Sequence, residues 1–345
     1  MVKLAVVTVQ AHKELAPPVG VVESLSRGFE TTNARLWLIL LPLLLDLFLW
    51  IGPRLSVEGL TQQWVNFLTS TLATESGFQQ NAGVLLDQLT AFGRQFNLFS
   101  ILSAVPFGLP SLMAGRSPLA TPFGPNVAVP VTNELLYILV FISFSLSGLL
   151  LGAIYFGLIA SQLRGSRPGL VLWLRQVFGN WGRFLVMSLL LALAGLILGA
   201  SMILMMQFLG LFAPAAAQIM FVVAVTITLW VFVYVSFTPH GVVLGGQGVF
   251  AALWDSVRLV RWNLPATVGL FSLILALSWG LNLVWNLPRD DSWLLLLGVA
   301  GHAYVATGLV TASFVFYKDR HRWWREARAL LIARLEQDRQ RLGER

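Results

Sequence analysis

Four polar residues lie inside apolar stretches of the sequence, where a side chain that can do chemistry is most conspicuous. Asp46 is flanked by leucines on both sides, His302 lies midway along an apolar run, and Asn282 and Asn286 are one helical turn apart. A charged group at the centre of a membrane span costs at least ~2.5–3.5 kcal/mol, so Asp46 must face protein or water and have a partner. These four residues form the candidate polar site within the membrane.

Each of these residues has a functional and a structural interpretation. Asp46 is either a proton or ligand site, or an acid whose hydrogen bonds fix helix packing; no Lys or Arg is predicted at comparable depth. For His302 the structural interpretation, packing with a satisfied hydrogen bond, is favoured, because no second His or carboxylate stands at helical spacing to complete a metal site. For Asn282 and Asn286, hydrogen bonding between helices is the default and a substrate groove is the alternative.

Enzyme chemistry is not indicated elsewhere in the chain. With no cysteine, disulfides, thiolate metal sites and cysteine nucleophiles are excluded. The glycine-rich stretch 241–248 lacks the Gly-Lys-Ser/Thr ending of a phosphate loop. Glu134, Asp290 and Asp291 are too few acids to build a lipid-active centre. The sequence therefore predicts a non-enzymatic protein without a cofactor or a metal ion.

Composition indicates the class of protein. Hydrophobic residues make up 57% of the 345 residues and charged residues only 11%, whereas charged residues are about a quarter of soluble proteins. Apolar runs recur at about 20 residues, the length that crosses a hydrocarbon core of about 30 Å, and the alternating pattern of a membrane barrel is missing. The predicted fold is an all-α polytopic membrane protein.

The apolar runs divide the chain into three regions. Residues 1–35 form an interfacial segment, 36–317 a transmembrane domain with an insertion at 54–131, and 318–345 a basic helix. Inside the insertion, residues 97–113 are apolar but broken by prolines, which favours a re-entrant or an interfacial segment over a span. The six predicted spans are about 36–51, 135–163, 184–209, 215–237, 266–287 and 293–317.

Two short patterns predict local structure. Gly148-x-x-x-Gly152 and Gly195-x-x-x-Gly199 predict close helix approach in the second and third spans. The sequence Pro239-His240-Gly241 predicts a turn after the fourth span.

Basic residues gather on one side of the predicted spans. Short cytoplasmic loops carry an excess of Lys and Arg, which places both termini in the cytoplasm and the 54–131 insertion outside. The cytoplasmic side would carry Lys3, Lys13, Arg27, Arg35, Arg164, Arg167, Arg175, Arg183, Arg258, Arg261 and the tail from Lys318; the outer side would carry Arg54, Arg94, Arg116 and Arg289.

The junctions before three spans share one pattern. An amphipathic segment, an asparagine with nearby arginine, and a span follow one another at Asn33, Asn180 and Asn263. This predicts three repeats of an interfacial helix plus a hairpin, the first carrying the insertion. The alternative is that any hairpin-built membrane protein shows such junctions, because arginine reaches the interface and asparagine caps helices.

The third junction also carries a resemblance. Its residues Pro239, Val242-Val243-Leu244, Gly248, Ala252, Ser256 and Leu259-Val260-Arg261-x-Asn263 resemble a signature of the membrane domain attached to some bacterial glycerophosphodiester phosphodiesterases and of the related YciC-like membrane proteins. The resemblance covers about residues 130–320 and implies a six-span helical fold without an established activity. Those proteins commonly have an acidic residue where this chain has Gly245-Gly246-Gln247, and the phosphodiesterase barrel is missing, so catalysis is not carried over.

Function is predicted from the basic interface. The tail from Lys318 combines basic residues with Trp323 and Trp324, a pattern that attracts anionic lipid, and it lacks a nucleic-acid-binding module. We expect a lipid-binding protein or an accessory or scaffold component of a membrane complex. The alternative is a small-molecule or lipid transporter with its site around Asp46. The expected headgroup contacts are Arg183, Arg261, Lys318, Arg320, Arg322 and Arg325.

Overall fold

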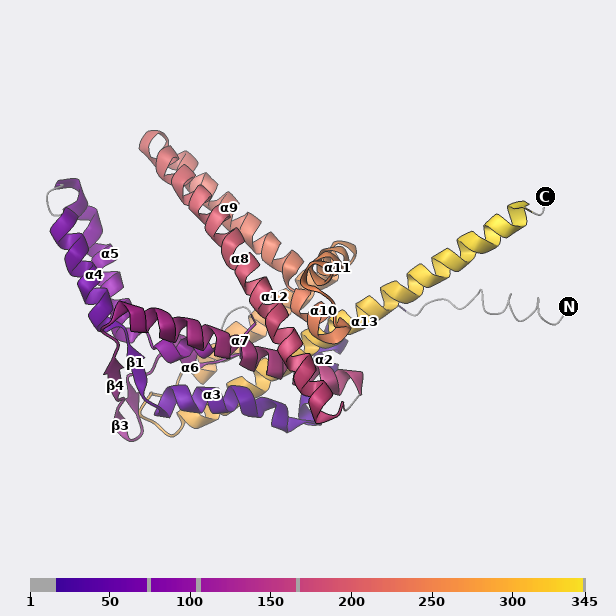
Figure 1. The fold of residues 1–345 in the computed structure, drawn as a ribbon, viewed down its shortest axis with the longest axis horizontal. Coiled ribbons are helices and arrows are strands. Elements are labelled where there is room, and N and C mark those ends of the chain that lie inside the picture. The colour runs from indigo at the N-terminus through magenta and orange to yellow at the C-terminus, as the bar shows by residue number, and fades with distance from the viewer. Residues whose placement is uncertain (1–16, 73–75, 104–106, 166–167, 344–345) are drawn as a thin grey trace.

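The computed structural model describes residues 17–72, 76–103, 107–165 and 168–343 (Figure 1). Its elements in chain order are α2 (Val21–Asn33), η1 (Leu36–Ile39), α3 (Leu40–Ile51), β1 (Arg54–Ser56), α4 (Glu58–Leu72), α5 (Ser76–Gln95), η2 (Leu98–Ser103), α6 (Met113–Arg116), β2 (Ala120–Thr121), β3 (Gly124–Pro125), β4 (Ala128–Pro130), α7 (Glu134–Arg164), α8 (Leu170–Phe212), α9 (Pro214–Val235), α10 (Thr238–Gly245), α11 (Val249–Trp262), α12 (Leu264–Trp285) and α13 (Leu295–Gly343).

Among the residues that the structure describes, five helical stretches are long and apolar enough to cross a membrane: Glu134–Arg164, Leu170–Phe212, Pro214–Gly245, Leu264–Trp285 and Leu295–Ala333. A sixth is obtained if the pair Val21–Asn33 and Leu36–Ile51, bent by 94°, counts as one span. The chain is therefore an all-α integral membrane protein with five or six spans. The bend lies at the predicted boundary between the N-terminal segment and the first span.

Two predicted boundaries, at residues 184 and 318, lie inside continuous helices. α8 is one helix of 43 residues that runs through residue 184, and α13 is one helix of 49 residues that joins the sixth span to the basic tail. A proline near the start of α12, Pro265, enforces the break at Asn263, whereas the Asn180 junction has no proline and its helix continues. No proline or glycine occurs between residues 309 and 342, so nothing ends α13 at Lys318.

The turn predicted at Pro239 is also wrong, because this proline occupies the first turn of the short helix α10, where its missing N–H has no helical partner to lose. The chain turns later, at Gly246, whose φ of 62° is in the left-handed region that glycine adopts without strain.

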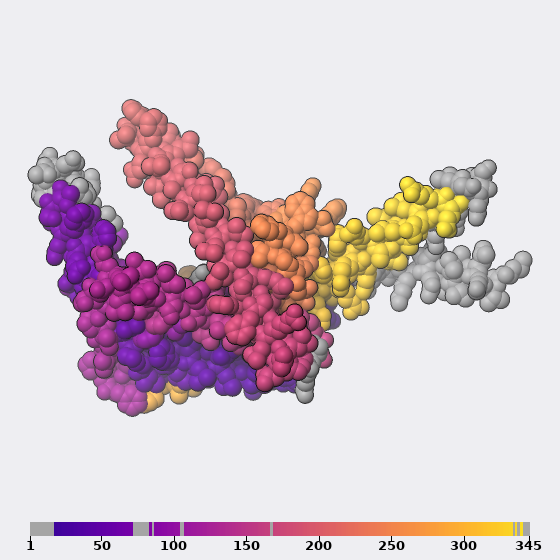
Figure 2. All heavy atoms as spheres, in the orientation of Figure 1, coloured from indigo at the N-terminus to yellow at the C-terminus, as the bar shows by residue number. Residues whose placement is uncertain are grey.

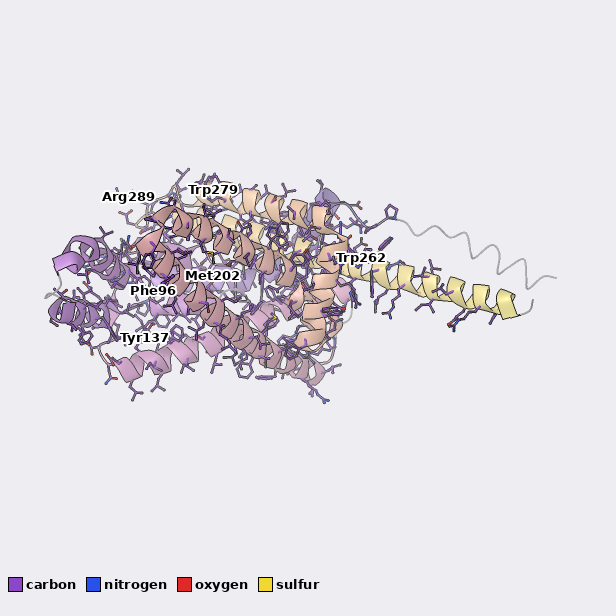
Figure 3. The ribbon with its side chains drawn as sticks, turned by 90° about the horizontal axis from the view of Figure 1, so that it is seen from above. Phe96, Tyr137, Met202, Trp262, Trp279 and Arg289 are labelled. Atoms are coloured by element: carbon purple, nitrogen blue, oxygen red, sulfur yellow. The ribbon has the colours of Figure 1, made fainter. Side chains whose placement is uncertain are left out.

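The molecule has two ends, each formed by a different set of elements. One end holds α2, α11, the start of α8 and the projecting half of α13; the other holds α4, α5, the strands and the turn between α12 and α13 (Figure 1). Figure 3 shows Trp262 at the first end and Phe96, Tyr137 and Arg289 at the second. We name them the basic end and the opposite end. At the opposite end β1 pairs with β4 in parallel, and β2 pairs with β3 antiparallel.

Two hairpins project from the body of the molecule. The α4–α5 hairpin and the α8–α9 hairpin point away from it and leave an open angle between them (Figure 2). At the tip of the α8–α9 hairpin, Leu211 is 78% and Phe212 is 76% exposed, so this apolar hairpin faces lipid or another protein when the chain is in a membrane.

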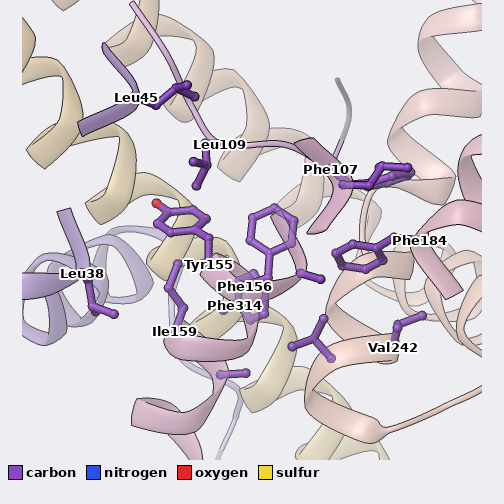
Figure 4. Packing of buried hydrophobic residues seen from close by; sticks show 14 of the residues in the cluster. Leu38, Leu45, Phe107, Leu109, Tyr155, Phe156, Ile159, Phe184, Val242 and Phe314 are labelled. Atoms are coloured by element: carbon purple, nitrogen blue, oxygen red, sulfur yellow. The ribbon is translucent and has the colours of Figure 1, made fainter. Parts of the chain in front are cut away.

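The largest core cluster brings together α3, the segment 107–113, α7, the middle of α8, α10 and α13 (Figure 4). Phe107 packs against Phe184 of α8 with 5.4 Å between ring centroids, and Phe156 of α7 lies 5.6 Å from Phe314 of α13. The segment 107–113 is thus part of the core although it is not helical before Met113.

The glycines of α7 make room for this segment. A Cβ at Gly152 would overlap the carbonyl oxygen of Phe107, and one at Gly148 would lie 2.8 Å from the oxygen of Leu102. The close approach predicted at these glycines is therefore made by the short helix η2 at Gly148 and by the non-helical segment 107–113 at Gly152. At Gly195 and Gly199 of α8, an added Cβ would meet no atom of the described residues within 4 Å, so no close approach occurs there.

Candidate functional site

The Asp46 carboxylate is fully buried on α3 and holds the segment 107–113 in place. It accepts hydrogen bonds from the backbone N–H groups of Leu112 and Met113, both at 3.0 Å, and from the hydroxyl of Ser111. Ser111 in turn accepts a hydrogen bond from the N–H of Ala114 in α6. An irregular buried segment has backbone donors without helical partners, and Asp46 satisfies two of them.

His302 of α13 faces the same carboxylate. Its Nδ1 lies 3.6 Å from Oδ2 of Asp46, beyond the length of a hydrogen bond. About one turn further along α13, Thr307 bonds to the hydroxyl of the fully buried Tyr155 of α7 at 3.0 Å. Asp46 and His302 are thus brought close together, and the Tyr155–Thr307 pair is a separate polar contact between α7 and α13.

Ser111, Asp46 and His302 include the residue types of a hydrolase triad but not its arrangement. In a triad the nucleophile contacts the base, and the acid lies behind the base. Here Ser111 donates directly to Asp46, and the hydroxyl caps the start of α6. The arrangement fixes the segment 107–113 and does not activate a nucleophile. Within the described residues, no three His, Asp or Glu side chains are grouped so that they could hold a metal ion.

Asn282 and Asn286 belong to a different polar group, at the opposite end. Asn286 Nδ2 donates to the Asn282 carbonyl oxygen at 2.8 Å. Beside them Arg116 donates to Asp290 Oδ1 and to the Pro288 carbonyl oxygen, both at 2.5 Å. Through these hydrogen bonds Arg116 connects the end of α6 to the turn between α12 and α13. The four residues predicted to form one polar site form two separate pairs.

A cationic groove lies at the basic end. It measures about 610 Å³ and is bordered by Arg164 at the end of α7 and by Arg175 and Arg183 of α8. None of its lining residues is acidic, and no carboxylate of the described residues forms an ion pair with these arginines. The full lining is Arg164, Leu172, Arg175, Gln176, Gly179, Asn180, Arg183, Val243 and Gly246.

The arginines of the groove are positioned by their helices. Arg164 Nη1 donates to the Val243 carbonyl oxygen at 3.3 Å, and Arg183 Nη1 donates to Asn180 Oδ1 at 3.4 Å. Arg175 is exposed and makes no hydrogen bond from its side chain to any other described residue. Most of the guanidinium donors thus remain available to an anion, which arginine binds through paired N–H groups.

The other predicted headgroup contacts have varied surroundings. Lys318 donates to the Leu163 carbonyl oxygen at 2.5 Å, in the last turn of α7, and Arg322 pairs with Glu326 at 2.8 Å. Arg261 and Arg325 are exposed, whereas Arg320 is buried. Of the six, Arg183, Arg320 and Arg322 line cavities that the structure describes, and the cavity beside Arg322 also contains Glu23, Asp319 and Glu326.

Arg164 and Arg175 were not among the predicted site residues. A signal for Arg175 was present, because it precedes Arg183 by eight residues, a little over two helical turns. The role of Ser111 carried no sequence signal, because it depends on the path of the segment around Asp46.

No protein-family model, curated protein or solved structure matches this chain.

The Asp46→Asn substitution is expected to lower the melting temperature of the purified protein in detergent. An amide retains one acceptor oxygen but turns an N–H donor toward the backbone donors of the segment, and a lost buried hydrogen bond costs ~1–3 kcal/mol. The matched control is Asn282→Ala, because Asn282 is exposed and its side chain bonds only to Asn286. Equal melting temperatures for wild type and Asp46→Asn would contradict the anchoring role.

Proposed function

We propose that this protein is a non-enzymatic membrane protein that binds anionic phospholipid headgroups at its basic end and serves as a lipid-binding accessory component of a membrane complex. The observation that carries the proposal is the groove of Arg164, Arg175 and Arg183, which contains three cations and no acid. Its volume of about 610 Å³ is within the ~300–1,000 Å³ that ligand sites occupy.

The position of the groove supports a lipid as the ligand. Leu172 lines it, and Phe178 on the next turns of α8 is 55% exposed. The same helix continues as an apolar span whose most apolar stretch is not buried in the structure. A headgroup in the groove would therefore have its acyl chains beside an apolar helix. The exposed α8–α9 hairpin provides a surface for a membrane-protein partner.

The proposed orientation follows from the charges. The basic end carries most of the Lys and Arg residues, which favours a cytoplasmic location in a bacterial inner membrane. We also propose that the chain contains three repeats of an interfacial helix plus a hairpin. Asn33 is the last residue of α2 and Asn263 directly follows α11, each before the helix of a span. Asn180 lies inside α8 at the corresponding point.

The orientation is tested with single cysteines, since the natural chain has none. Gln63→Cys on α4 and Ala329→Cys on α13 are both exposed positions at opposite ends. In intact bacterial cells a membrane-impermeant maleimide is expected to label Gln63→Cys at once and Ala329→Cys only after permeabilisation. The reverse pattern would contradict a cytoplasmic basic end.

Transport is the second candidate function, and the observation that favours it is the approach of His302 to Asp46. A transport site must be reached by its substrate, whereas Asp46 is 0% exposed and its oxygens accept hydrogen bonds from the segment 107–113. These contacts support the structural role of Asp46 over transport.

The lipid proposal is tested by replacing both cations that α8 contributes to the groove. In the Arg175→Gln/Arg183→Gln variant, affinity for a doubly charged lipid such as cardiolipin is expected to fall roughly 30-fold, because each basic residue near anionic lipid contributes about 1 kcal/mol. Native mass spectrometry of the detergent-solubilised protein counts the bound lipid, with phosphatidylcholine as the neutral comparison.

The control is Arg289→Gln, which removes a cation from the opposite end, where the side chain is 84% exposed. Its cardiolipin affinity is expected to equal that of wild type. If the double variant binds cardiolipin as wild type does, the groove is not a lipid site.

A further inference from the structure

A second cavity at the basic end is organised around one buried arginine. Arg320 of α13 is only 4% exposed, and its guanidinium carbon lies 3.4 Å from the centroid of the Phe316 ring. Its Nε and Nη1 atoms are enclosed and have no hydrogen-bond partner among the described residues. A buried charge without a partner is strongly unfavourable, so an anion that accepts hydrogen bonds from this guanidinium would stabilise it.

The cavity opens between α11 and α13 beside two tryptophans. Arg258 lies 5.9 Å from the ring centroid of Trp254 and 5.0 Å from that of Trp324, so aromatic faces hold its guanidinium over the cavity. The other lining residues include the exposed Trp262, a residue type enriched where membrane meets water. The full lining is Asp255, Arg258, Leu259, Trp262, Asn263, Arg320, His321 and Trp324.

The size of the cavity restricts what can enter. Its enclosed part is about 20 Å³, which is room for about one water-sized group. An anion can thus insert one oxygen atom toward Arg320 while the rest of its molecule stays outside, between Trp262 and Trp324. A headgroup attached to acyl chains meets this requirement, because its phosphate reaches inward while its chains remain at the membrane.

The charges around the cavity favour a ligand with a single negative charge. Arg258 and Arg320 contribute two positive charges, because a guanidinium stays protonated in proteins. Asp255 contributes one negative charge and accepts a hydrogen bond from Gln247 at 2.6 Å. The net charge of these three lining groups is therefore +1, which one phosphodiester neutralises. Asp319 is next to Arg320 in the chain, but it lines a different cavity and accepts a hydrogen bond from the N–H of Val19.

We propose that this cavity is a second lipid site that binds the singly charged phosphodiester of a phospholipid headgroup, with a phosphate oxygen accepting hydrogen bonds from Nε and Nη1 of Arg320 and with Arg258 beside it. The inference rests on the proposed lipid-binding function and deepens it, because the two sites select different charges. The three-arginine groove takes a headgroup with more than one charge, and the Arg320 cavity takes a phosphodiester such as that of phosphatidylglycerol.

The test measures how far phosphatidylglycerol raises the melting temperature of the full-length protein in neutral detergent, which reports binding to the folded state. In Arg320→Gln the apparent affinity for phosphatidylglycerol is expected to fall at least tenfold. Without lipid this variant is expected to melt at or above the wild-type temperature, because an unpaired buried charge has been removed. A purely structural role for Arg320 predicts the opposite, a lower melting temperature without lipid.

Two further variants and one control complete the design. Arg258→Gln, on the other helix, is expected to weaken phosphatidylglycerol binding in the same direction, and Arg320→Lys is expected not to restore it, because lysine cannot offer the paired N–H groups. Arg339→Gln removes an exposed charge from the same helix α13 and should bind as wild type does. Unchanged phosphatidylglycerol binding in both Arg320→Gln and Arg258→Gln would overturn the proposal.

The source of the phosphodiester is tested with glycerophosphoglycerol, the same headgroup without acyl chains. It is expected to give no stabilisation at concentrations at which phosphatidylglycerol saturates. Equal stabilisation by the two compounds would overturn the assignment to a lipid. The groove variant Arg175→Gln/Arg183→Gln is expected to keep its phosphatidylglycerol response, so that failure of the groove and failure of this cavity are distinguished.

Discussion

The structure depends on the need to satisfy irregular backbone inside an apolar core. Residues 107–112 cross the bundle without helical hydrogen bonds, and a polar backbone group without a partner is costly in such surroundings. Asp46 supplies the acceptors for Leu112 and Met113. A carboxylate in the middle of an apolar helix is expensive by itself; here its charge is matched by three donors that would otherwise be unsatisfied.

The rest of the bundle is arranged around this segment. Gly152 lets the backbone of the segment approach α7 to a distance that any side chain would prevent, and Gly148 does the same for the preceding η2. At its far end Arg116 binds the turn between α12 and α13 through Asp290 and Pro288. The segment therefore connects α3, α7 and the α12–α13 hairpin. With these helices fixed, the basic ends of α7 and α8 meet and form the arginine groove.

The class of fold and most of the helices could be predicted from the sequence, because a long apolar run can satisfy its backbone hydrogen bonds inside a membrane by forming a helix. Asp46 and His302 could also be identified, since polar groups in apolar runs are rare. The continuity of α8 and α13 was not predicted. A change from an amphipathic to an apolar pattern marks a change of surroundings, and the helix continues through it unless a proline intervenes. That Asp46 and His302 lie apart from Asn282 and Asn286 could not be predicted, since contacts between distant segments leave no local pattern in the sequence. Arg320 was predicted as one of six headgroup contacts, but its burial was not predicted, because that depends on how the other helices pack around α13.

The central claim is that residues 107–113 are an integral part of the core, held by Asp46 and accommodated by Gly152. Amide hydrogen exchange measured by mass spectrometry on the detergent-solubilised protein tests it most directly. The peptide that contains these residues should exchange as slowly as the buried middle of α7 in wild type and in Gly157→Ala, where a Cβ meets no described atom within 4 Å. In Gly152→Ala, where the Cβ would overlap the Phe107 oxygen, protection should be lost. Fast exchange in the wild-type protein, or equal protection in the two glycine variants, would contradict the account.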